Sequence, residues 1–210
     1  MEILRMGNRG EEVGSLPGLL TLKELNLDNY LGWSIQDIGF EDSIMAWHLA
    51  SEICLFGDRT NESSLLEAIR VLSNYMMFLL VLRPYMLPGP VRRSRYSQFH
   101  HDLLDEFMQA ARAGAKSPQD LLDWSLRKGF HARIHSDVPH KYFDAGVRLA
   151  DALFDRPNGL EVIFGVWVEM LCYVANHCSR ESHARQLSMG GELVTAVWLM
   201  ARHASLSFIV

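Results

Sequence analysis

The stretch GVWVEMLCYVANHCSRESHARQLSMGGELVTAVWLM, from Gly165 to Met200, decides the fold of this chain. Residues 160–178, which include the first part of this stretch, are apolar around almost the whole circumference of a helix. Such a helix must be covered by its neighbours, so we expect a central helix at about residues 160–178. The twin glycines Gly190 and Gly191 predict a turn, because glycine has the greatest backbone freedom. Helical spacing resumes at Glu192.

The rest of the chain shows the same helical spacing and few stretches that alternate as strands do. Apolar residues three or four positions apart predict four further helices, at residues 42–56, 64–83, 99–114 and 143–154. Ser64 and Glu67 have the form of a capping box at the start of the second of these. A serine–proline start predicts one short helix over residues 117–129. We therefore expect an all-α protein, an irregular multi-helix bundle around the central helix.

Proline and glycine divide the chain. We expect a helical domain over residues 41–203, preceded by residues 1–40, a poorly defined segment that could be flexible. A Pro/Arg-rich hinge is predicted at residues 84–96, because its prolines cannot continue a helix. The basic cluster of this hinge, residues 92–96, fits a solvated charged loop best. A phosphorylation site and contact with anionic lipid headgroups are the alternatives.

Length and composition narrow the classes of function. The chain has 210 residues, 49% of them hydrophobic, so it can bury a sizeable core. Its formal net charge of -5 argues against sequence-independent nucleic-acid binding, which needs clustered lysine and arginine. Three cysteines in apolar surroundings suit free thiols in a reducing compartment.

Two stretches are the most apolar, Tyr75–Leu82 and Leu160–Ala175. The first is shorter than the ~18 apolar residues that a membrane span needs, and the second carries Glu161 and Glu169. From these stretches we expect no membrane span in this chain.

Three sequence elements indicate a relationship to a known family. They are IMAWHLASEIC (residues 44–54), LSNYMMFLLVLRPYMLP (residues 72–88), and the pair VWVEMLCYVANHC and HARQLSMGGELVTAVWLM (residues 166–178 and 183–200). These elements resemble a plant family known as domain of unknown function 594, which occurs together with a companion domain 4220. The third element is the most specific, because many uncommon residues keep a defined spacing. Ser51 stands where the family usually has threonine.

The resemblance implies a fold and a context but no reaction, because the family has no established activity. Its members are typically longer and carry several membrane-spanning helices upstream. The chain is therefore expected to be a C-terminal portion, located in the cytoplasm or at the cytosolic face of a membrane. Residues 201–210 differ from the family's usual ending, so a truncated gene fragment without independent function is one alternative. We expect a non-catalytic helical interaction or regulatory module with an unidentified protein partner and no nucleic-acid partner.

Histidine, cysteine and glutamate side chains raise the alternative of a metal site. His48 and Glu52 lie one helical turn apart, and His177, Cys178 and His183 carry the nitrogen and sulfur atoms that zinc prefers. Their spacing matches no strong zinc signature. We therefore assign no metal, no cofactor and no catalytic residue, and keep a metal-dependent enzyme that uses the three histidines as the alternative function.

A nucleophilic cysteine is a second alternative. Cys172 or Cys178 would have to pair with a histidine to form a reactive thiolate. Activation requires an electropositive, partly exposed setting, which an apolar helix does not provide. We therefore expect buried and unreactive thiols.

A larger set of residues is assigned structural or interaction roles. The polar residues near the twin glycines would form buried hydrogen bonds or a recognition surface, and we favour the hydrogen bonds. A buried charge needs a partner, so we expect Arg185 or another basic group to compensate Glu169. The full set is Trp47, His48, Glu169, His183, Arg185, Gln186, Gly190, Gly191 and Glu192.

Overall fold

The computed structural model describes residues 16–57, 63–89, 91–116, 141–154 and 156–206, together with Asp120 and Asp123. All regular structure in this part of the chain is helical, which confirms the predicted all-α multi-helix fold. The short helix expected at residues 117–129 lies almost entirely outside the described residues. The helices are α2 (Leu19–Glu24), α3 (Asp28–Leu31), α4 (Trp33–Gln36), α5 (Phe40–Gly57), α6 (Ser64–Leu82), the 3-10 helix η1 (Pro84–Met86), α7 (Arg93–Arg112), α9 (Lys141–Phe154), α10 (Gly159–His177), α11 (Arg180–Ser188) and α12 (Leu193–Leu206).

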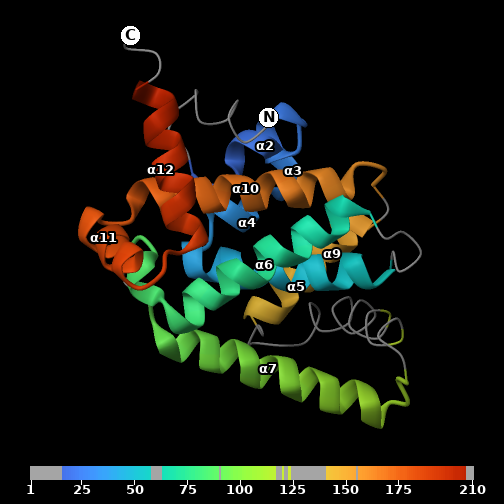
Figure 1. Ribbon diagram of the computed structural model, residues 1–210. Helices are drawn as coiled ribbons and strands as arrows, with labels where there is room; N and C mark the ends of the chain where they lie inside the picture. Colours follow the sequence, from blue (N-terminus) through green and yellow to red (C-terminus); the bar gives the residue numbers. More distant parts are fainter. Residues whose placement is uncertain are drawn as a thin grey trace.

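Helices α5 and α10 form the centre of the bundle (Figure 1). Helix α5 packs on α6 and α9, whereas α10 packs on α6, α12 and α2 and also contacts α5 and α9. Helix α10 is the predicted central helix, and most of its apolar side chains are buried. Helix α7 lies along the far side of the bundle from α10 and α12 (Figure 1).

The structure corrects two expectations for the connecting segments. Residues 1–40 were expected to be poorly defined, and their first fifteen residues lie outside the described part of the chain. Residues 16–40 contain α2, α3 and α4, and both Leu22 and Leu31 are buried in the core. These helices are four to six residues long, too short to show a helical period in the sequence. The predicted hinge at 84–96 is packed at its start, where Met86 is buried, and α7 already begins within it at Arg93.

Two helix starts also differ from the sequence analysis. The hydroxyl of Ser63, and not that of Ser64, caps α6, because Ser63 Oγ accepts a hydrogen bond from the Leu66 N–H at 3.3 Å. Helix α11 was not expected as a separate helix. Ser179 caps it by accepting a hydrogen bond from the Ser182 N–H at 3.1 Å.

The tryptophans of the two central helices are fully buried and hydrogen-bonded. Trp167 Nε1 on α10 donates to Ser51 Oγ on α5 at 2.9 Å, and the Ser51 hydroxyl donates to the Trp47 carbonyl at 2.7 Å. Trp47 Nε1 donates to Ser34 Oγ at 3.2 Å. Burial of two large rings stabilises the bundle, and these bonds satisfy the indole N–H groups that burial removes from water.

Replacing Ser51 with alanine is expected to lower the free energy of unfolding by about 1–2 kcal/mol, because the Trp167 N–H would lose its acceptor inside the core. Urea unfolding of wild type and variant measures this loss. Ser51→Thr is the matched control, because it keeps the hydroxyl. A Ser51→Ala variant as stable as wild type would contradict a stabilising role for this hydrogen bond.

Helices α6 and α10 are long and apolar enough to cross a membrane, by length and composition alone. The stretch Tyr75–Leu82, taken by itself as too short, is the C-terminal part of the 19-residue helix α6. In the bundle, 61% of the apolar window of α10 is buried, and the outward side of α6 carries Glu67, Arg70 and Asn74. Core helices of a bundle pass the same test of length and composition.

Candidate functional site

The polar residues predicted near the twin glycines meet at the junction of α6, η1, α11 and α12. His183 is fully buried there. Its Nε2 lies 3.0 Å from the carbonyl oxygen of Ala175 and its Nδ1 lies 3.1 Å from the hydroxyl of Thr195. Because a carbonyl only accepts, Nε2 donates to Ala175, and Nδ1 pairs with the Thr195 hydroxyl. The ring also stacks on Trp198, with 4.6 Å between centroids.

A second network joins α6 to the start of α12. The hydroxyl of Tyr75 accepts a hydrogen bond from the Val194 N–H at 3.1 Å and donates to Glu192 Oε2 at 3.4 Å. Arg83 Nε lies 3.8 Å from Glu192 Oε1. Burial, with the nearby Glu192 charge, raises the pKa of Tyr75 to about 12, so this side chain stays a neutral donor at physiological pH.

Replacing Tyr75 with phenylalanine is expected to lower the free energy of unfolding by about 1 kcal/mol, because the Val194 N–H loses its acceptor. Thermal and urea unfolding measure the change. Tyr30→Phe serves as the control, since Tyr30 is 56% exposed. Equal stability of the Tyr75→Phe and Tyr30→Phe variants would show that the junction does not depend on this hydroxyl.

The remaining predicted residues of this region complete the junction. Gln186 is buried and its amide donates to the hydroxyl of Tyr85, while the Arg185 guanidinium lies 5.3 Å from the centroid of the Tyr85 ring. Gly190 and Gly191 have φ values of 103° and 84°, which confirms the need for glycine in this turn. No atom lies within 4 Å of a Cβ built on either glycine, so these glycines do not serve a close approach of another helix.

Glu169 lies elsewhere and has different partners from those expected. Its carboxylate accepts hydrogen bonds from the backbone N–H groups of Gly18 at 2.9 Å and Leu20 at 3.1 Å, and from both the N–H and the hydroxyl of Thr21. The predicted compensation by Arg185 is therefore wrong. The carboxylate is satisfied by N–H groups at the start of α2, which have no acceptor within the helix and carry partial positive charge. Gly165 makes room for this contact, since a Cβ there would meet Thr21 Cγ2 at 2.7 Å.

The residues considered as metal ligands do not form a common site. His48 Nδ1 lies 2.8 Å from Ser73 Oγ, and Glu52 on the same helix is exposed. His177 is exposed at the end of α10, and its Nδ1 lies 2.9 Å from the carbonyl oxygen of Tyr173 on the same helix. His183 has both ring nitrogens engaged. Within the described residues, no three His, Cys, Asp or Glu side chains come close enough together to hold a metal ion.

The three cysteines are free thiols. Burial raises the pKa of Cys54 to about 12 and also raises the pKa of Cys172 and Cys178. Each thiol therefore stays protonated at physiological pH, in a state that is a poor nucleophile.

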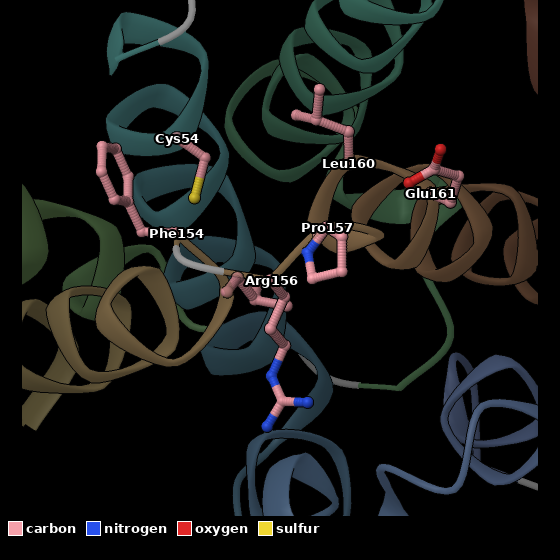
Figure 2. Close-up of a pocket in the computed structure, with 8 residues that line it drawn as sticks. Cys54, Phe154, Arg156, Pro157, Leu160 and Glu161 are labelled. Carbon is pink, nitrogen blue, oxygen red and sulfur yellow. The ribbon is translucent and has the colours of Figure 1, made fainter.

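A cavity of about 330 Å³ lies between the ends of α5 and α9 and the start of α10 (Figure 2). Its walls include Cys54, Leu153 and Leu160. The Arg156 guanidinium points away from this space, because Nε donates to the Ala152 carbonyl at 2.8 Å and the group lies 5.1 Å from the Tyr30 ring centroid. The polar groups around the cavity thus do not converge on a common point, as they would around a polar ligand.

The basic cluster of the predicted hinge is only partly solvated. Arg95 pairs with Glu41, at 3.0 Å between Nε and Oε1, and with Asp42. The backbone N–H of Arg92 donates to Glu41 Oε2 at 2.8 Å. These contacts fix the start of α7 to the start of α5, so the interpretation as a solvated loop is wrong for Arg95.

Large apolar side chains are exposed beside the junction. We call this the C-terminal apolar surface, and it consists of Leu187, Met189, Leu193, Leu199 and Met200. On α12, Leu199 lies on the side of the helix away from the buried residues Val194 and Val197. Met189, at the turn before the twin glycines, is 65% exposed. The sequence pattern does not reveal this surface, because these side chains have the same spacing as core residues.

The C-terminal part of the chain matches a known protein family. Residues 154–206, about a quarter of the chain, match the family described as protein of unknown function, DUF594. We call residues 154–206 the DUF594 region, after the family that they match. No curated protein and no solved structure matches the chain.

The DUF594 region contains α10, α11 and α12, and hence the C-terminal apolar surface and the buried His183. It is completed by side chains from outside the match, since Tyr75, Arg83 and Tyr85 come from α6 and the residues after it. These three side chains were not predicted from the sequence. Two of them are tyrosines on or next to an apolar helix, where a hydroxyl requires a hydrogen-bond partner if it is buried, and this was the available signal.

Proposed function

We propose that this chain is a non-catalytic helical interaction or regulatory module of a membrane-associated family, and that the C-terminal apolar surface binds its partner. The observation that supports this proposal most is the exposure of Met189, Leu193 and Met200 next to a hydrogen-bonded junction. Soluble monomers rarely expose large contiguous apolar patches, and such patches on native proteins commonly mark interaction sites.

The polar groups of the DUF594 region support the same proposal. His183, Gln186 and Glu192 are engaged with Thr195, Tyr85 and Tyr75. These interactions hold α11 and α12 in place on α6 and α10. They therefore support a role as the scaffold that presents the apolar side chains. The free cysteines fit the cytosol or the cytosolic face of a membrane, which is the location we propose.

Photo-crosslinking in cells that naturally produce the chain tests this proposal. A photoreactive amino acid replaces Met189 or Leu199 on the C-terminal apolar surface, or Val71 on α6, which is 53% exposed and serves as the control. We expect discrete adducts from positions 189 and 199 at several times the yield from position 71. Equal yields from all three positions would contradict the proposed function. The mass of each adduct identifies it as protein or lipid.

A further inference from the structure

The charge around the C-terminal apolar surface indicates the chemistry of its partner. Arg180, Arg185 and Arg202 are exposed within α11 and α12, where Glu181 is the exposed acidic residue. The other acidic side chain of this segment, Glu192, faces Arg83 across 3.8 Å. The segment is therefore locally basic in a chain whose formal net charge is -5.

This pattern favours an anionic partner over a second copy of the chain. In a symmetric dimer, the two copies of the surface would bring like-charged arginines together, which is unfavourable. An anionic partner would instead attract the arginines while the apolar side chains between them become buried.

The shape of the surface favours a bilayer among anionic partners. Met189 lies at the turn between α11 and α12, and Leu193 begins the next helix. The C-terminal part of α12 projects past α10 (Figure 1), and Met200 belongs to the C-terminal half of this helix. Apolar side chains on a protrusion can enter the boundary between headgroups and acyl chains, while basic residues beside them contact anionic headgroups.

We propose that the C-terminal apolar surface docks on the headgroup region of a bilayer that contains anionic lipids. This inference rests on the proposed function and names the partner of the same surface. Leu187, Met189 and Leu193 enter the interface around the turn, and Leu199 and Met200 enter it along α12. Arg180 and Arg202 bind lipid phosphate or carboxylate groups.

Helix α7 provides an internal comparison. It also exposes three large apolar side chains, Leu104, Phe107 and Met108. Beside them lie Asp105 and Arg112, which have opposite charges. This second surface is also apolar but is not locally basic, and it lies on another side of the bundle (Figure 1).

Vesicle co-sedimentation of the purified chain tests the inference. The probes are vesicles of phosphatidylcholine alone and of phosphatidylcholine with phosphatidylserine. We expect binding to the vesicles that contain phosphatidylserine, reduced about tenfold or more by Met189→Ser/Leu193→Ser and by Arg180→Gln/Arg202→Gln. Leu104→Ser/Met108→Ser on α7 is the matched control and should bind as wild type does. Circular dichroism and thermal unfolding establish that each variant is folded.

Several outcomes would overturn the inference. Equal binding to both vesicle types, or an equal loss in the α7 control, would show nonspecific apolar adhesion. A doubled mass in light scattering without vesicles, abolished by Met189→Ser/Leu193→Ser, would make a second copy the occupant. Absence of vesicle binding together with protein adducts at position 189 would reject the bilayer and leave the proposed interaction module standing. Absence of both would reject the proposed function as well.

Discussion

Replacing Glu169 with alanine is expected to lower the free energy of unfolding by about 3 kcal/mol. The carboxylate accepts hydrogen bonds from the N–H groups of Gly18, Leu20 and Thr21, and these groups would lose a charged acceptor together. The loss should be greatest at the start of α2, which has only six residues and depends on packing against α10. Urea unfolding measures the total effect, and amide hydrogen exchange at Leu20 and Thr21 measures the local one.

The control for this variant is Glu161→Ala, which removes an exposed carboxylate from the same helix. Its expected effect on stability is within about 0.5 kcal/mol of zero. Glu169→Gln should fall between the two, because the amide keeps one acceptor oxygen and turns an NH₂ group toward backbone donors. If Glu169→Ala and Glu161→Ala are equally stable and exchange at the same rates, the proposed anchoring of α2 by Glu169 is wrong.

Protonation of His48 alone is expected to lower the free energy of unfolding by about 2 kcal/mol between pH 7 and pH 5. The total loss through His48 reaches about 3 kcal/mol at more acidic pH. Burial lowers the pKa of His48 from 6.5 to about 4. Between these two pKa values the unfolded chain binds a proton that the folded chain does not, so acid favours unfolding. Below about pH 4 this histidine causes no further loss.

Urea unfolding at several pH values, with wild type and His48→Asn, measures this contribution. Asparagine keeps a polar group near Ser73 but does not titrate, so the pH dependence of the variant should be flatter by the amounts given above. His177→Asn is the control, because it makes the same substitution at an exposed histidine on another helix. Parallel profiles for wild type and His48→Asn would show that His48 does not couple folding to pH.

Long helices were predictable from the sequence because each carries its own pattern. Helices α5, α6, α9, α10 and α12 lie close to their expected ranges, since an apolar stripe with helical spacing is a local property. The short helices α2, α3 and α4 were not predictable, because four to six residues do not complete enough turns to show a stripe. Their apolar residues take helical form on the surfaces of α5 and α10, so packing decides their structure.

The candidate site was predictable in part for the same reason. The turn at Gly190 and Gly191 was predictable because a backbone with positive φ favours glycine, which is visible in the sequence. The hydrogen bonds of His183 and Gln186 were expected as a class, but Thr195 and Tyr85 were not named as their partners. A partner depends on which helices meet and in which rotation about their axes, and the sequence pattern contains neither.

The sequence by itself determined that this protein is helical, that α10 is apolar nearly all round, and that a glycine turn precedes the last helix. Only the tertiary structure decided where each polar group finds its partner. Glu169 shows the difference, because its need for compensation follows from its place on an apolar helix, whereas its donor Gly18 is 151 residues away. The exposure of Met189 was decided in the same way. The spacing of apolar residues shows which face of its own helix a side chain occupies, but burial depends on the neighbouring helices that cover that face.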